Sequence, residues 1–142
     1  MRTRTLVALL ALTLACGQKA PPVPPQLVRP EPVAELGAMA TPEGVRLSWG
    51  RPDHYTSGKR MNDLGGFTIE RAPAEGGEFA RVGTVEVTDR TRFRKEHRFT
   101  WTDGTATVGA RYRYRVIAFT TDGYHSAPAG PVSVQYGKPP GD

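Results

Sequence analysis

Hydrophobic and polar residues alternate along several short stretches between residues 33 and 136. In Val45–Trp49 the apolar residues occupy positions 45, 47 and 49, and Phe67–Arg71 has the same two-residue period. In Tyr112–Ala118 the residues at 112, 114, 116 and 118 fall on one face of an extended chain. A two-residue period is typical of strands that bury one face. The pattern therefore predicts strands in this part of the chain.

Turn-forming residues separate these stretches, and the last of the stretches is Pro131–Val134. No window of the sequence shows a sustained helical period. Short strands divided by Gly, Pro, Asp and Asn over roughly a hundred residues are typical of an antiparallel sandwich. We therefore expect an all-β domain over residues 33–136.

Several features within this span resemble a fibronectin type III domain. They are Trp49 followed by Pro52, the stretches Leu64–Arg71, Glu75–Gly83 and Trp101–Asp103, the pair Gly109 and Tyr112, and the hairpin Thr120–Pro128. The resemblance covers nearly all of residues 33–136. It implies a seven-stranded antiparallel immunoglobulin-like sandwich.

Four aromatic residues are expected to have structural roles in such a sandwich. The resemblance places Trp49 in the core on the second strand, and Trp101 in the segment that precedes the tyrosine corner. It assigns Tyr112 to that corner, where a tyrosine hydroxyl bonds to the backbone. Tyr114 shares the buried face of the same strand.

The N-terminus has the layout of an export signal. Arg2 and Arg4 precede the apolar stretch Leu6–Ala15, and the single cysteine of the chain, Cys16, follows it. The apolar stretch is shorter than the roughly 20 residues that a membrane-spanning helix needs. Residues 12–16 resemble the lipobox of bacterial lipoproteins, with the small residue Ala15 before the cysteine, although Thr13 replaces the commoner leucine.

The lipoprotein resemblance implies that residues 1–15 are a signal peptide and that Cys16 carries covalent lipid, including palmitate. Gly17 stands where an aspartate retains many lipoproteins at the inner membrane, so we expect the outer membrane, on either its periplasmic or its surface face. The alternative is an ordinary cleaved signal peptide with an incidental cysteine. No cofactor other than this lipid is expected.

Proline dominates the segment from Cys16 to Pro32. Such a composition favours an extended polyproline II path, which would make this segment a semi-rigid tether of about 50 Å. Its first part, Cys16–Pro24, also resembles the start of a small outer-membrane lipoprotein that assists assembly of the lipopolysaccharide translocon, with Ala20 in place of a glycine. We expect residues 137–142 to form a flexible C-terminal tail.

Composition and motifs argue against some classes of function. The formal net charge is +5 and 38% of residues are hydrophobic, which suits a mildly basic globular domain. Ser57 and Ser126 lack the context of a catalytic nucleophile, and the glycine pairs at 65–66 and 76–77 are those of bends and hairpins. We therefore expect a protein that is not an enzyme. The export signal disfavours nucleic acid as a partner.

The expected topology gathers three loops, at about residues 50–66, 86–98 and 120–128, at the end of the sandwich where the N-terminus enters. The candidate binding residues on these loops are Lys59, Arg60, Arg90, Arg92, Arg94, Lys95, Arg98 and Tyr124. Three hypotheses stay open. The loops are merely solvated, or their arginines bind an anionic lipid or glycan, or His54, His97 and His125 hold a metal.

These observations together predict a lipid-anchored, non-enzymatic envelope protein that binds or scaffolds a partner. The partner is expected to be an envelope protein or a glycan, and the oligomeric state stays open. The alternatives are direct recognition of an anionic lipid or glycan by the basic loops, and an auxiliary role in the lipopolysaccharide translocon.

Overall fold

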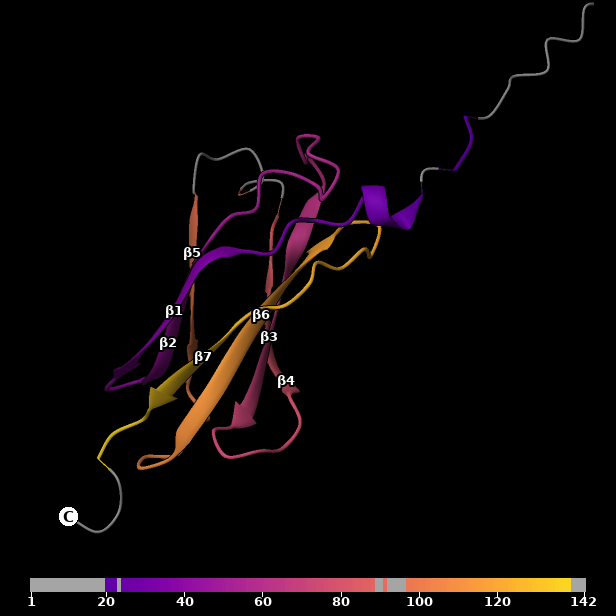
Figure 1. The fold of residues 1–142 in the computed structure, drawn as a ribbon. Helices are drawn as coiled ribbons and strands as arrows, with labels where there is room; N and C mark the ends of the chain where they lie inside the picture. The colour runs from indigo at the N-terminus through magenta and orange to yellow at the C-terminus, as the bar shows by residue number, and fades with distance from the viewer. Residues whose placement is uncertain (1–19, 23, 89–90, 92–96, 139–142) are drawn as a thin grey trace, which may run out of the picture.

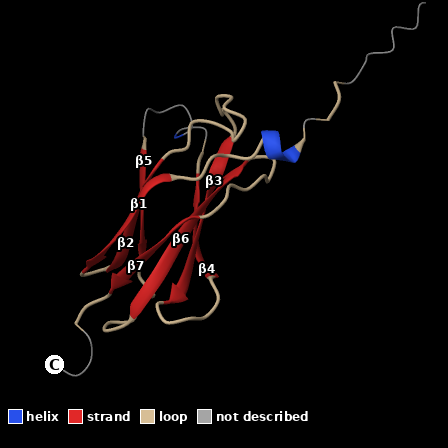
Figure 2. Cartoon of the chain, in the orientation of Figure 1, coloured by secondary structure: helices blue, strands red, loops and turns tan. Residues whose placement is uncertain are grey.

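The computed structural model describes residues 20–22, 24–88, 91 and 97–138. Seven strands lie within these residues: β1 (Ala34–Thr41), β2 (Gly44–Gly50), β3 (Leu64–Pro73), β4 (Ala80–Glu86), β5 (Arg98–Asp103), β6 (Arg111–Thr120) and β7 (Ala129–Gln135). A single turn of 3-10 helix, η1 (Pro25–Leu27), precedes them (Figure 2).

The strands form two antiparallel sheets packed face to face (Figure 1). One sheet has the order β1-β2-β5, and the other has the order β4-β3-β6-β7. This arrangement confirms the prediction of a seven-stranded immunoglobulin-like sandwich.

The two-residue period of the sequence sets which side chains enter the core. Val45, Leu47 and Trp49 of β2 are fully buried, as the alternation predicted. In the facing sheet, β3 and β6 are paired so that Phe67 lies opposite Ala118 and Ile69 opposite Val116. The apolar faces of the two sheets therefore meet and exclude water, which is the main stabilising term of the fold.

An aromatic cluster fills the half of the core nearer the N-terminal segment. The Phe67 ring lies 5.3 Å from the Trp49 ring, edge to face, and 4.7 Å from the Phe99 ring. Tilted and edge-to-face pairs at these separations are favourable beyond the area that they bury. The indole nitrogen of Trp49 is buried and has no hydrogen-bond partner among the described residues.

Trp101 closes one side of the sandwich between β5 and β4. A Cβ atom placed on Gly83 of β4 would lie 2.3 Å from the Trp101 ring. Only glycine leaves room for the indole at this point. The half-buried Trp101 thus covers the backbone of the opposite sheet.

The first and last described segments lie at opposite ends of the sandwich (Figure 1). The loops 51–63, 87–97 and 121–128 form the end near η1, which we call the loop pole. The loops 42–43, 74–79 and 104–110 form the other end, which we call the far pole. Among the described residues, no helix has the length and apolar character needed to cross a membrane.

Candidate functional site

The N-terminal segment Pro24–Glu31 lies against the loop pole. The Thr56 N–H donates to the Arg29 carbonyl at 2.9 Å, and the Glu31 N–H donates to the His54 carbonyl at 3.0 Å. The Thr56 hydroxyl also donates to the Gln26 carbonyl. These bonds tie the segment to loop 51–63.

Pro30 anchors this contact. It is among the fully buried residues of the protein, and it forms a β-bridge with Tyr55. The proline composition led us to expect a free spacer through Pro32, and the structure differs from that expectation for Pro24–Glu31. The physical reason is that proline rings are apolar and can be buried, while the backbone carbonyls of the segment accept bonds from the loop.

Tyr55 holds loop 51–63 from the other side. Its hydroxyl donates a hydrogen bond to Asp63. Burial, followed by this bond and the charge of Asp63, raises the pKa of Tyr55 to about 12. The phenol therefore stays protonated and fixes the loop on which the N-terminal segment rests.

Half of the predicted binding residues fall outside the described residues: Arg90, Arg92, Arg94 and Lys95. Lys59 and Arg60 are exposed on loop 51–63. Arg98 stands at the start of β5, where it donates to the Glu35 carboxylate at 2.6 Å. Tyr124 is half-buried, and its N–H donates to the Thr120 hydroxyl at 3.0 Å. The structure therefore does not bring the described candidates together into one site.

The described loops of this pole are not basic overall. Loop 51–63 carries three cationic side chains, and the acidic side chains of loops 51–63 and 121–128 are also three, namely Asp53, Asp63 and Asp122. Equal numbers of opposite charges on the same loops offset each other at long range. Any further positive potential of the loop pole would come from Arg90, Arg92, Arg94 and Lys95, which lie outside the described residues.

The three histidines have separate places. His54 forms a β-bridge with Arg60, and His125 forms one with Phe119 and packs near its ring. The His97 carbonyl accepts the Arg51 N–H at 2.7 Å. Within the described part of the chain no group of three metal-ligating side chains occurs. The hypothesis of a three-histidine metal site therefore has no support in the described geometry.

The far pole contains a buried polar network that the sequence did not point to. The carboxylate of Asp103, 1% exposed, accepts hydrogen bonds from the Arg71 guanidinium at 2.7 Å and from the Tyr114 hydroxyl at 2.7 Å. The hydroxyl and N–H of Thr105 donate to its other oxygen at 2.7 and 3.0 Å. Every oxygen of this buried carboxylate is therefore satisfied.

The network shifts the pKa values of its members. Burial acts to raise the pKa of Asp103, but the bonds from Thr105, Tyr114 and Arg71 outweigh it and hold the pKa below its usual value. Burial and the bond to Asp103 raise the pKa of Tyr114. Asp103 is thus ionised and Tyr114 neutral, which suits a structural ion pair rather than a proton-transfer site.

Tyr112 makes the contact expected of a tyrosine corner. Its hydroxyl accepts a hydrogen bond from the Thr107 N–H at 2.9 Å. The Arg71 guanidinium lies over its ring, 4.7 Å from the centroid. The corner and the Asp103 network therefore support each other at the far pole.

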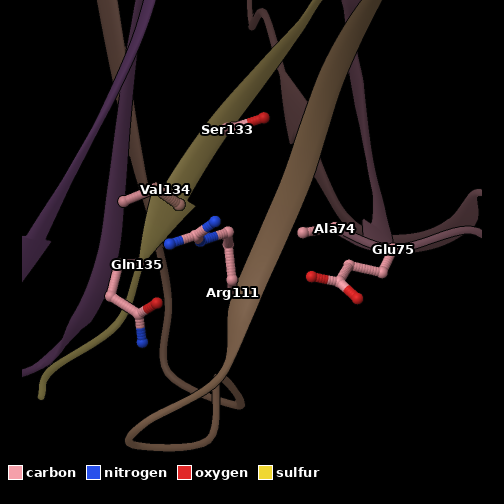
Figure 3. A pocket seen from close by; sticks show the side chains of 6 residues that line it. All are labelled: Ala74, Glu75, Arg111, Ser133, Val134 and Gln135. Carbon is pink, nitrogen blue, oxygen red and sulfur yellow. The ribbon is translucent and has the colours of Figure 1, made fainter. Parts of the chain in front are cut away.

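A pocket of about 420 Å³ opens at the same end of the sandwich, on the outer face of the four-stranded sheet. Its lining residues are Ala74, Glu75, Arg111, Ser133, Val134 and Gln135 (Figure 3). They come from loop 74–79, from β6 and from β7. None of them was predicted, because only the register of β6 against β7 and the path of the loop place them together.

Comparisons with known proteins agree with this fold. The sequence matches no family model and no curated protein sequence. The structure is similar to the twitchin kinase region from C. elegans, with 24% identity and a TM-score of 0.57, over 78% of this chain but only 17% of that chain. The fold is that of a fibronectin type III domain.

Two similar structures are single domains. A Fn3-like protein from Clostridium thermocellum has 20% identity and a TM-score of 0.52, and the match covers 77% of this chain and 95% of that chain. The fourth FNIII domain of a human protein has 13% identity and a TM-score of 0.55, and the match covers 92% of this chain and 93% of that chain. Identities this low show a shared fold.

Proposed function

We propose that this chain is a lipid-anchored, non-enzymatic protein of the cell envelope whose fibronectin type III fold binds or scaffolds a partner. The sequence of the N-terminus supports the anchor, because Cys16 follows a short apolar stretch and a small residue. We expect covalent lipid on Cys16 and placement in the outer membrane. Two or more acyl chains are needed for stable anchoring.

The docking of Pro24–Glu31 on the loop pole is the observation that carries the proposal. This segment enters at one end of the sandwich, opposite the far pole (Figure 1). With the proposed anchor at Cys16, we expect the far pole to face away from the membrane. A scaffold module needs a defined orientation toward its partner. The buried Pro30 and the bonds around Thr56 support this proposal, because they fix the N-terminal segment relative to the sandwich.

A protein partner is favoured over direct lipid recognition by the loops. The described residues of loops 51–63 and 121–128 carry equal numbers of cations and anions, which gives little attraction to an anionic surface. The lipid or glycan alternative depends on Arg90, Arg92 and Arg94. Replacing these three by serine in the unlipidated protein would leave binding to anionic liposomes unchanged under our proposal, and loss of such binding would favour the alternative.

The anchor is tested by Cys16→Ala in the full chain. We expect the variant to leave the membrane fraction and to lose radiolabelling with palmitate, while the wild-type chain keeps both. Lys19→Ala is the matched control, since it changes a nearby residue without removing the sulfur. Membrane association of Cys16→Ala equal to that of the wild type would contradict the proposal.

The orientation is tested by site-specific photo-crosslinking in intact cells. A photoreactive residue at Glu78, exposed at the far pole, should capture a defined envelope protein. The same residue at Ser57, exposed at the loop pole, should capture it less. Stronger capture from Ser57 would contradict the orientation even if the anchor were established.

A further inference from the structure

Three arginines alternate along the outer face of β6, and the structure gives them different environments. Arg113 donates to the carbonyls of Pro73 and Gly77 at 3.0 and 3.2 Å. Arg115 donates to the Glu70 carboxylate. Among the described residues, Arg111 has neither a hydrogen bond nor an ion pair through its side chain. Its guanidinium is therefore available to a ligand.

The pocket around Arg111 offers further polar groups that are at least partly exposed and have free hydrogen-bonding capacity among the described residues. The hydroxyl of Ser133 and the carboxylate of Glu75 make no hydrogen bond to other described residues. The Gln135 amide nitrogen donates to the Gly109 carbonyl at 2.8 Å, which leaves the amide oxygen of Gln135 as an acceptor. Figure 3 shows Arg111 extending toward β7, with Glu75 on the other side of β6.

The walls of the pocket are held in place without a ligand. The Ala74 N–H donates to the Arg111 carbonyl at 3.1 Å, which attaches loop 74–79 to β6. The guanidinium groups of Arg113 and Arg115 lie 5.0 and 4.2 Å from the centroid of the Phe79 ring, at the far end of the same loop. The backbone of the pocket is therefore fixed before binding, and the conformational entropy lost on binding is mainly that of the Arg111 and Glu75 side chains.

The charges of the pocket select the class of ligand. Arg111 offers a planar fork that fits a carboxylate or a phosphate. Glu75 lines the same pocket and repels a doubly charged phosphate, but it attracts an ammonium group. A zwitterion carries one charge complementary to each of these two side chains. The volume of about 420 Å³ lies at the small end of ligand sites and suits one or two amino-acid residues.

We propose that this pocket binds a short peptide segment that carries a free carboxylate and a protonated amine. The carboxylate lies against the Arg111 guanidinium and the Ser133 hydroxyl, and the amine lies toward Glu75. This inference deepens the proposed function, because it names a ligand class for the pole that a chain anchored at Cys16 presents away from its membrane.

The test uses the full chain, labelled with ¹⁵N and purified in detergent micelles, with the dipeptide Lys-Ala as the probe. We expect amide shifts at Arg111, Ser133 and Gln135 with a Kd on the order of 1 mM, as befits a ligand of this size. Lys-Ala with an amidated C-terminus should bind about tenfold more weakly, because it lacks the carboxylate. Inorganic phosphate should bind more weakly than Lys-Ala.

Variants locate the binding. Arg111→Gln should weaken binding of Lys-Ala about tenfold, and Glu75→Gln should weaken it about threefold because an exposed charge contributes less. The control is Arg46→Gln, an exposed arginine of β2 in the other sheet, which should bind as the wild type does. Binding is measured without a membrane, so its failure is distinct from a failure of the anchor.

Several results would overturn the inference. Equal binding of the amidated dipeptide would show that no carboxylate is recognised, and tighter binding of phosphate would show an anion site of another class. Absence of shifts at the pocket with Lys-Ala at about tenfold above the expected Kd would show no site at all. The first two results use the wild-type chain, so they do not depend on the folding of any variant.

Discussion

The loop pole and the far pole of the sandwich use polar groups in different ways. At the loop pole, backbone groups of Pro24–Glu31 bond to loop 51–63, and the charged side chains of the described loops offset one another. At the far pole, Arg71 and Asp103 form a buried ion pair, while Arg111 is left without a partner among the described residues. The loop pole is thus suited to holding the N-terminal segment, and the far pole is suited to binding a ligand on a rigid surface.

Asp103→Asn should have the largest effect, because it removes the charge on which the far pole is organised. We expect the free energy of unfolding to fall by about 3–5 kcal/mol, since the Arg71 guanidinium is left without its counter-charge. Urea denaturation measures this loss. The control Glu35→Gln breaks the exposed pair with Arg98 and should cost less than about 1 kcal/mol.

Asp103 also makes the stability of the protein depend on pH in the acidic range. Because the folded-state pKa of Asp103 lies below the ordinary value of 3.8, its contribution to stability is present above that value and is lost as the pH falls through the folded-state pKa. In Asp103→Asn the free energy of unfolding should therefore fall less steeply at acidic pH than in the wild type. An unchanged slope would show that the far pole is not held by this carboxylate.

Pro30→Ala tests the attachment at the loop pole. We expect a loss of about 1–2 kcal/mol, because two buried methylene groups are removed from a fully buried ring. Thermal unfolding measures it. Pro22→Ala is the matched control, since Pro22 is exposed, and it should leave the melting temperature unchanged. Equal effects of the two substitutions would mean that the N-terminal segment is not docked.

Tyr55→Phe removes the bond to Asp63 beneath that segment, and the expected loss is about 1 kcal/mol. The pKa of Tyr55 is raised from 10.0 to about 12, so this contribution is present below pH 10 and is lost as the pH rises through about 12. Ultraviolet titration of tyrosinate should therefore show Tyr55 and Tyr114 as phenols that ionise late. Tyr55→Phe should remove the step at about pH 12 and leave that of Tyr114. A step at about pH 12 that persists in Tyr55→Phe would assign it to another tyrosine.

Arg113→Gln and Arg111→Gln should differ, although the two arginines share a strand and a face. Arg113→Gln should cost about 1 kcal/mol of stability, because it releases the carbonyls of Pro73 and Gly77 and the Phe79 ring. Arg111→Gln should change the free energy of unfolding by less than about 0.5 kcal/mol. Denaturation of both variants measures the difference, and a larger loss for Arg111→Gln would show that it has a structural role.

The fold was predictable because its signals are local. The apolar residues at alternate positions in Val45–Trp49 and Tyr112–Ala118 fixed which faces are buried, and the structure buries Trp49 and Tyr114 fully. Asp103 was not predictable in the same way. In the sequence it stands before Gly104 as an ordinary turn residue, and its burial depends on the pairing of β2 with β5.

Long-range contacts explain the other differences. The composition of Pro24–Glu31 favours an extended spacer, and nothing local shows that loop 51–63 offers it hydrogen-bond partners. Alternation places Arg111, Arg113 and Arg115 on one face, but only the path of loop 74–79 decides which of them is satisfied. The pocket at the far pole was missed for that reason.

The docking of Pro24–Glu31 also sets how far the domain can search for a partner. Because Pro24–Glu31 is docked on the sandwich, the linker from the proposed anchor at Cys16 would end at Pro24 rather than at Pro32. A shorter linker raises the local concentration of the domain for any partner on the same membrane within its reach, and removes partners beyond it. If the proposed anchor at Cys16 holds, the buried ring of Pro30 therefore limits the distance at which a partner on the same membrane can be reached.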